Sequence, residues 1–163
     1  MKRYRGLSAF LIVALLLWVM PFSAGAAGEF EVENGVLIKY NGTGQAVTIP
    51  SGVYSIGDGA FAGNTRIKSV TIPDYVYYIG NNAFNGCNNL QTVDYADSIV
   101  SVGAHAFEDT AWLASQSDPY VCINTVLIAY NSTEKAASVP QGVVSIAAYA
   151  FAKLNWIGKD FVF

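Results

Sequence analysis

The 163-residue sequence predicts a β-rich repeat solenoid, with units of about 23 residues made of short strands and turns, and with inserted β-hairpins. Two observations lead to this prediction. A motif with several fixed positions recurs every 23 residues, and a longer segment that begins with a hairpin pattern recurs after 90 residues. Regular self-similarity on these scales is typical of coils that stack along one axis.

The N-terminus has the layout of a secretory signal peptide. Lys2, Arg3 and Arg5 precede the nearly all-apolar stretch 7–20, and small residues fill 23–27. We therefore interpret 1–26 as a signal peptide and 27–163 as the repeat domain, in a protein that is secreted or displayed at the cell surface. The alternative is an uncleaved membrane anchor, but the apolar stretch is shorter than the ~20 residues that span a bilayer.

The charge balance excludes several classes of partner. Removal of 1–26 leaves 6 of the 9 Lys and Arg residues against 12 Asp and Glu residues, a net charge of −6. This speaks against nucleic acid and against anionic lipid surfaces, so membrane contact is expected only through the signal peptide. One histidine and two cysteines without a CxxC motif are too few ligands for a structural zinc site, and no cofactor is predicted.

The 23-residue period defines the expected core. Val47-Thr48-Ile49-Pro50 returns as Val70-Thr71-Ile72-Pro73, and Val93 keeps the register. An aromatic ring follows an alanine in each unit, and an aliphatic residue precedes it by five positions. We predict that these residues form the shared core: Phe61, Phe84, Phe107 and Phe151, with Ile56, Ile79, Val102 and Ile146.

The 90-residue shift divides the domain into two blocks, each beginning with a hairpin. The expected order is a hairpin over 30–42 around Asn34-Gly35, repeats over about 45–109, a linker over 110–119 with room for one helical turn, a second hairpin over 120–132, a repeat over about 136–157 and a truncated strand over 161–163. One unit cannot bury its apolar side chains alone, so neighbouring units must stack.

Within a unit, Ile67-x-x-Val70-x-Ile72 has the spacing of a leucine-rich repeat strand, and the proline that follows ends it. With the V-x-x-I-G, A-F and G-C-x-x-L segments, this pattern resembles the BspA-type leucine-rich repeat proteins of bacterial cell surfaces. The resemblance covers Phe30 to about Asn155. It implies a secreted or surface-displayed binding module, in a family linked to adhesion, and no enzyme activity.

A binding surface is expected among the variable repeat positions. Strand residues whose side chains alternate with the core should line one face, and exposed tyrosines should add aromatic area; Tyr54 and Tyr77, 23 residues apart, should form a ladder. Alternatively, the tyrosines only cover the flank of the coil. The candidate residues are Lys68, Thr71, Gln91 and Asp94, with Tyr54, Tyr75, Tyr77 and Tyr78.

Other candidate sites favour ordinary structural roles. His105 lies in a variable, solvent-facing position with no nucleophile or orienting carboxylate assigned to it. Glu108-Asp109 reads as a solvated turn. Cys87 reads as a small interior residue and Cys122 as a strand residue, and their different repeat positions argue against a disulfide.

The leading hypothesis is an exported, non-catalytic repeat module that binds a protein or a glycan. The alternative is a truncated or structural repeat fragment of a larger surface protein whose functional part lies elsewhere. Phe161-Val162-Phe163 resembles a strand cut off before its proline, so end-to-end self-association through an uncapped end is also expected.

Overall fold

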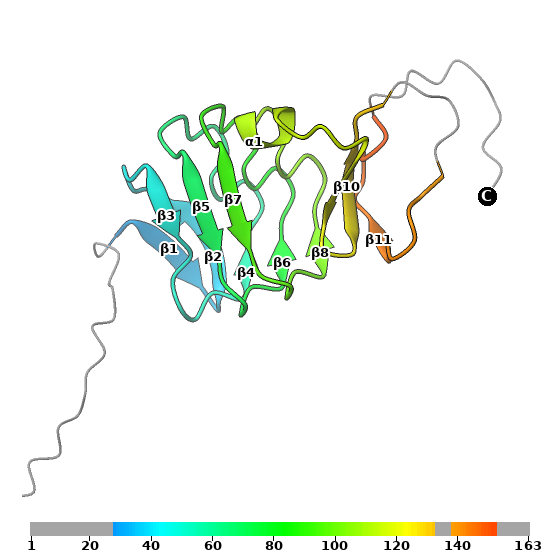
Figure 1. Cartoon of the computed structure of the whole chain (residues 1–163). Coiled ribbons are helices and arrows are strands. Elements are labelled where there is room, and N and C mark those ends of the chain that lie inside the picture. Colours follow the sequence, from blue (N-terminus) through cyan, green and yellow to red (C-terminus); the bar gives the residue numbers. More distant parts are fainter. Residues whose placement is uncertain (1–27, 133–137, 153–163) are drawn as a thin grey trace, which may run out of the picture.

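A computed structural model describes residues 28–132 and 138–152. The signal-peptide segment, both ends of the fourth repeat and the expected strand at 161–163 lie outside these residues. The described chain winds as a solenoid, with its strands side by side along one axis (Figure 1). The first hairpin lies at one end of the row, and the strands of the second block lie at the other.

Two sheets form the walls of the coils. The five-stranded sheet has the order β1-β2-β4-β6-β8, and we call it the hairpin wall; the three-stranded sheet β3-β5-β7 is the repeat wall. All neighbours in these sheets pair in parallel except β1 and β2. The strands are β1 (Phe30–Glu33), β2 (Val36–Tyr40), β3 (Ala46–Thr48), β4 (Ser55–Ile56), β5 (Ser69–Ile72), β6 (Tyr78–Ile79), β7 (Thr92–Tyr95) and β8 (Ser101–Val102).

The predicted repeat register is the observed pairing register. Val47 pairs with Val70 and Val70 with Val93 in the repeat wall. Ile56 pairs with Ile79 and Ile79 with Val102 in the hairpin wall. Because side chains alternate along a strand, a 23-residue step that keeps the register places these residues in the interior of every coil.

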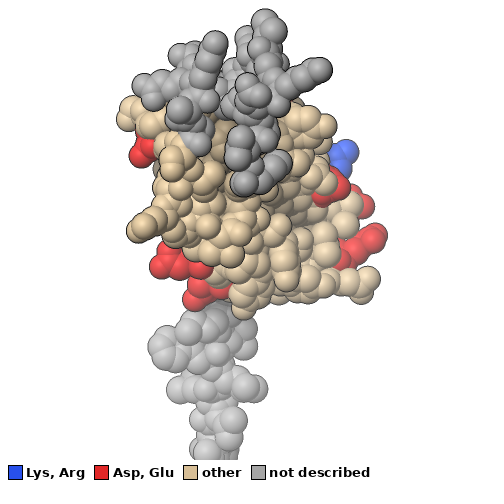
Figure 2. All heavy atoms as spheres, turned by 90° about the vertical axis from the view of Figure 1, so that its right-hand side faces the viewer, with Lys and Arg blue, Asp and Glu red and all other residues tan. Residues whose placement is uncertain are grey.

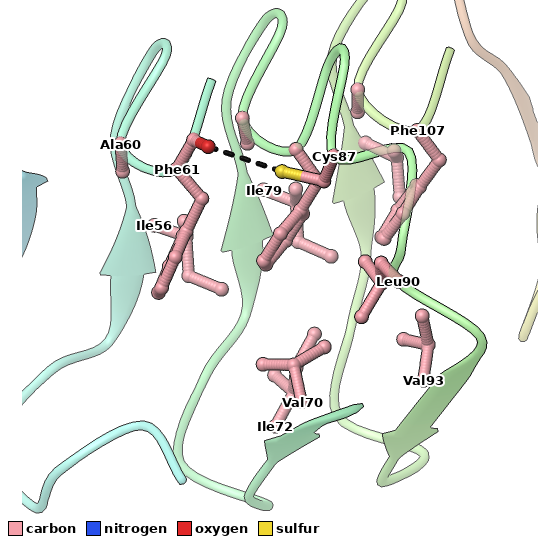
Figure 3. Packing of buried hydrophobic residues seen from close by; sticks show 14 of the residues in the cluster. Ile56, Ala60, Phe61, Val70, Ile72, Ile79, Cys87, Leu90, Val93 and Phe107 are labelled. Carbon is pink, nitrogen blue, oxygen red and sulfur yellow. Dashed lines mark hydrogen bonds between the residues drawn. The ribbon is translucent and has the colours of Figure 1, made fainter. Parts of the chain in front are cut away.

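Aromatic rings stack along the axis between the two walls. The ring centroids of Phe61 and Phe84 are 4.8 Å apart, and those of Phe84 and Phe107 are 5.1 Å apart, with nearly parallel planes (Figure 3). Tyr40 covers Phe61 at one end, and Trp112 covers Phe107 at the other. Each ring therefore fills the space between two coils, as the sequence predicts.

The glycine that follows each of the strands β4, β6 and β8 allows the backbones to approach closely. A Cβ on Gly80 would lie 2.7 Å from the backbone nitrogen of Asp58, and a Cβ on Gly103 would lie 2.5 Å from that of Asn81. These are backbone atoms, which cannot rotate away. The N–H groups of the two glycines instead donate to Ile56 O at 2.7 Å and to Ile79 O at 2.8 Å in the preceding coil.

The second block begins with a short helix and a second hairpin. Helix α1 (Ala111–Ala114) lies where the linker has room for one turn, and Thr110 caps it by accepting a hydrogen bond from the Leu113 N–H at 3.1 Å. Strands β9 (Tyr120–Ile123) and β10 (Val126–Tyr130) form the hairpin, and β11 (Ser145–Ile146) pairs with β10 in parallel.

The second block does not continue the hairpin wall. Strands β8 and β10 lie close together, but β10 belongs to a separate sheet with the order β11-β10-β9. Val121, Ile123 and Val126 still join the buried cluster of the first block. The apolar core is therefore continuous across a junction at which the sheet is interrupted.

Two expected core positions differ in the second block. Ile146 is 47 % exposed, so its assignment to the core is wrong; β11 is the edge of its sheet, and no described strand covers its outer side. Phe151 is half-buried and contacts Tyr130, with ring centroids 5.5 Å apart. It does not extend the stack of Phe61, Phe84 and Phe107, because Trp112 covers that stack.

Candidate binding surface

The outer face of the repeat wall carries regular columns of polar side chains. Thr48 pairs with Thr71, and Thr71 with Asp94, across β3, β5 and β7. A second column precedes these strands, where the Lys68 N–H donates to Gln45 O at 2.7 Å and the Gln91 N–H donates to Lys68 O at 2.8 Å. The structure therefore places the four predicted strand-side residues, Lys68, Thr71, Gln91 and Asp94, on one face.

These four side chains have no hydrogen-bond or salt-bridge partner within the described residues. Lys68, Gln91 and Asp94 are exposed, and Thr71 is half-buried. Their donors and acceptors include one ammonium and one carboxylate, and the backbone pairing sets the spacing of the residues that carry them. Such a face suits a ligand that has hydrogen-bonding groups of both kinds.

The predicted tyrosines lie elsewhere. Tyr54, Tyr77 and Tyr78 belong to the hairpin wall, on the other side of the core, and are 46 %, 45 % and 49 % exposed. The Tyr77 N–H donates to Tyr54 O, and the Val100 N–H donates to Tyr77 O, so Val100 continues this row. Val100 was not among the predicted surface residues, although it lies 23 residues after Tyr77 and therefore occupies the same repeat position.

Tyr54 and Tyr75 have structural roles. The Tyr54 ring lies over Gly35, where a Cβ would overlap it, and its hydroxyl donates to Asn34 O at 2.6 Å. The Tyr75 hydroxyl donates to Ile49 O at 3.0 Å in the preceding coil, and burial, with a smaller effect of Asp74, raises the pKa of Tyr75. The rings of Tyr54 and Tyr77 do not stack, and the Tyr77 ring lies beside that of Tyr78. The predicted tyrosine ladder is therefore present only as the backbone hydrogen bond from the Tyr77 N–H to Tyr54 O.

His105 occupies a backbone position that favours glycine. It has a φ of 55°, and the equivalent residues Gly59, Asn82 and Tyr149 also have positive φ, from 53° to 67°. Its side chain is 30 % exposed, with Nδ1 2.7 Å from the Glu108 carboxylate and its ring centroid 4.3 Å from that of Tyr149. The sequence signal for this left-handed position is that glycine and asparagine, which tolerate positive φ, occupy it in two of the four repeats, as Gly59 and Asn82.

The two cysteines are free thiols. Cys87 is fully buried, and its Sγ donates to Phe61 O at 3.1 Å (Figure 3). Burial raises the pKa of Cys87 to about 11, and burial also raises the pKa of the half-buried Cys122. A thiol that stays protonated in the interior is a packing residue rather than a nucleophile.

The described residues contain no group of three or more His, Cys, Asp and Glu side chains placed to hold a metal ion, and no helix among them is long and apolar enough to span a membrane. Seen from the end that carries the second block, acidic side chains lie along both flanks, and a basic side chain is visible at one place (Figure 2). Lys39, Arg66 and Lys68 are the basic residues of the described ranges.

The chain is similar to solved structures of bacterial leucine-rich repeat proteins, and the first of the following three supports the fold. The leucine-rich repeat protein of T. pallidum is 22 % identical, with a TM-score of 0.56, over 77 % of this chain and 65 % of that one. A leucine-rich repeat protein from Bacteroides capillosus is 30 % identical over 48 % of this chain and 67 % of that one, with a TM-score of 0.44. A leucine rich cell surface protein from Faecalibacterium prausnitzii is 18 % identical over 77 % and 51 %, with a TM-score of 0.29.

The chain thus spans between about half and two thirds of the length of these proteins. No curated protein sequence matches it. The family described as "BspA type Leucine rich repeat region" matches in six copies over residues 39–155. This match covers most of the chain and agrees with the 23-residue pairing register of the sheets. The chain therefore belongs to the BspA-type leucine-rich repeat family.

Proposed function

We propose that the protein is an exported, non-catalytic repeat module that binds a macromolecule, a protein or a glycan, at or outside the bacterial cell surface. The observation that carries this proposal is the outer face of the repeat wall. Lys68, Thr71, Gln91 and Asp94 stand there in register, without partners among the described residues. A regularly spaced row of polar groups that makes no hydrogen bond or ion pair within the described residues is free to bind a partner.

The repeat wall fits this role better than the tyrosine row of the hairpin wall. Tyr54 already uses its hydroxyl and one side of its ring to hold the first hairpin turn. Tyr75 uses its hydroxyl to join two coils. The remaining tyrosines, Tyr77 and Tyr78, form a smaller tilted pair with ring centroids 6.5 Å apart.

Binding is tested with the full mature chain against a glycan array and a panel of purified extracellular-matrix proteins. A Lys68→Ala, Gln91→Ala, Asp94→Ala triple variant is compared with a Tyr77→Ser, Tyr78→Ser variant of the opposite wall. We expect the triple variant to lose binding to whichever ligand the native chain retains, and the tyrosine variant to keep it. Binding lost only by the tyrosine variant, or no binding by the native chain, contradicts the proposal.

Export has its own test. The proposed signal peptide predicts that the full chain, expressed in a bacterial host, is released from the cytoplasm with Ala27 as its first residue. N-terminal sequencing of the fractionated product measures this. A product that stays in the cytoplasm and begins at residue 1 would show that 1–26 is not an export signal.

End-to-end self-association belongs to the same proposal. Val144 is 82 % exposed beside β11, whose outer side no described strand covers. An apolar sheet edge of this kind favours pairing with another chain. Sedimentation velocity over a range of concentrations should show a dimer that a Val144→Lys variant abolishes, and a concentration-independent monomer would exclude it.

A further inference from the structure

We number the three coils of the first block by their rings: Phe61 lies in the first coil, Phe84 in the second and Phe107 in the third. The junction between the third coil and the second block, which begins with the hairpin of β9 and β10, contains a cleft of about 220 Å³. One wall is the turn of the third coil around His105, Phe107 and Asp109, and the other is formed by residues of the second block, including Tyr130 and Ala150. The rings of His105 and Tyr149 meet across it, with centroids 4.3 Å apart. The cleft therefore lies where the hairpin wall is interrupted between β8 and β10.

Backbone N–H groups on the third-coil wall lack the acceptors that the same groups have in earlier coils. In the first coil, the N–H groups of Gly59, Phe61 and Gly63 donate to carbonyls of the second coil at 2.7–2.9 Å. The second coil repeats this pattern toward the third, with the N–H groups of Asn82, Phe84 and Gly86 as donors at 2.8–2.9 Å.

The equivalent groups of the third coil are the N–H groups of His105, Phe107 and Asp109. None of them donates to an acceptor among residues 28–132 and 138–152. Phe107 is only 2 % exposed, and a buried backbone donor without an acceptor is rare in folded proteins. The unpaired donors stand at alternate residues, and all three residues line the cleft.

The arrangement of these donors identifies the chemistry of an occupant. In the earlier coils the three acceptors are the carbonyls of alternate residues in one segment: Asn81, Ala83 and Asn85 for the first coil. A segment of polypeptide supplies carbonyls at that spacing, whereas the hydroxyls of a saccharide do not repeat in this way.

We propose that this cleft binds a turn segment of a partner polypeptide, shaped like residues 81–86, which continues the backbone ladder of the third coil. The partner's carbonyls accept hydrogen bonds from the N–H groups of His105, Phe107 and Asp109. This is recognition by main-chain addition, in which backbone hydrogen bonds supply affinity and side-chain space supplies selectivity. It involves neither the polar columns nor the tyrosine row.

The experiment uses the full mature chain labelled with ¹⁵N and a synthetic peptide of residues 80–86, acetylated and amidated, because this segment accepts the same three bonds from the first coil. We expect the amide proton signals of His105, Phe107 and Asp109 to move downfield together during titration. Those of Gly59, Phe61 and Gly63, whose bonds are already made, should not move. Unlabelled peptide of scrambled sequence serves as the specificity control.

Two variants at equivalent repeat positions test whether the peptide that moves the amide signals binds in the cleft. Ala152 lines the cleft, and Ala62, 90 residues earlier, makes the same backbone bond, 2.9 Å long, but lies in the first coil. Ala152→Trp should raise the Kd of the peptide at least tenfold, and Ala62→Trp should leave it unchanged.

Three results would overturn the proposal: no movement of the three signals at saturating peptide, equal loss of affinity in both variants, or movement caused by a neutral oligosaccharide and not by the peptide. Failure here leaves binding at the repeat wall untouched, because none of the residues changed for that test lines the cleft.

Discussion

The first three coils and the second block contain the same motif in different surroundings. Ile56, Ile79 and Val102 are at most 5 % exposed, whereas Ile146, 90 residues after Ile56, is 47 % exposed. Phe61 is buried between two rings, and Phe151 is half-buried beside the ring of Tyr130, its one ring neighbour in the described part of the chain. The difference teaches that the large aliphatic and aromatic positions of the repeat are fully buried where described coils cover them on both sides.

The two hairpins differ in a related way. In the first hairpin, Gly35 leaves room for the ring of Tyr54, whose hydroxyl holds the turn. The second block has Thr125 in its hairpin turn and Val144 before β11 at these positions, and Val144 is 82 % exposed. The two positions change together, because a side chain in place of Gly35 would overlap the tyrosine ring.

The largest expected effect comes from removing a ring in the middle of the stack. Phe84→Ala should lower the free energy of unfolding by about 3–5 kcal/mol, since it leaves a cavity between Phe61 and Phe107. Phe151→Ala, the same change in the second block, should cost less than about 2 kcal/mol. Urea denaturation followed by circular dichroism measures both, and equal losses would remove the distinction between the blocks.

A pH titration tests the interior of the first block through its thiol. Burial raises the pKa of Cys87 from 9.0 to about 11, so the folded state holds this proton more tightly than the unfolded state. The stabilisation is complete below pH 9 and is lost between pH 9 and pH 11, by about 2–3 kcal/mol.

The Cys87→Ala variant isolates this contribution from that of the buried tyrosines. Its stability should fall less steeply above pH 9 than that of the native chain, and the Cys122→Ala variant should resemble the native chain more closely. Parallel pH profiles of all three chains would show that the Cys87 site is not a desolvated interior position.

A methyl group added at the glycine that follows a strand should show how closely neighbouring coils pack in each block. In Gly103→Ala the new Cβ meets backbone atoms of the preceding coil, 2.5 Å away from the nearest, and should cost about 1–3 kcal/mol. The second block already has Ala147 at this repeat position, 7 % exposed, so Ala147→Gly should change stability by less than about 1 kcal/mol. Thermal unfolding compares the two; a neutral Gly103→Ala would contradict the close approach.

The smallest effect is expected at the first hairpin turn. Tyr54→Phe keeps the ring over Gly35 and removes only the hydrogen bond to Asn34 O, so it should cost about 0.5–1 kcal/mol. Val144→Phe, at the equivalent position of the second block, should leave stability unchanged within error. A larger loss in Val144→Phe than in Tyr54→Phe would reverse the assignment of roles.

Much of the fold was predictable because period and register are properties of the sequence. The spacing of Val47, Val70 and Val93 fixed the strand pairing, and Asn34-Gly35 fixed the first turn, in which both residues have positive φ. The interior position of Cys87 followed from its place in the repeat.

The remainder depends on contacts between elements that no single unit encodes. The separation of Tyr77 from Lys68 by the thickness of the core follows from which wall each strand joins. The exposure of Ile146 arises because β11 is the edge of its sheet, and the unpaired N–H of Phe107 lies where β8 and β10 fail to pair. A repeat motif describes an average coil and therefore cannot show where the ladder is interrupted.

Native-state hydrogen exchange of the full mature chain tests the central claim most directly. The N–H groups of Gly57, Gly80, Gly103 and Ala147 make the same bond to the preceding coil, at 2.7–2.8 Å in all four cases. Since the bonds match, differences in protection report on the surrounding coils. We predict that Gly80 exchanges most slowly and Ala147 fastest, with an opening free energy at least about 2 kcal/mol lower. Equal protection at all four positions, or slower exchange at Ala147 than at Gly80, would contradict the claim that stacking on both sides creates the core.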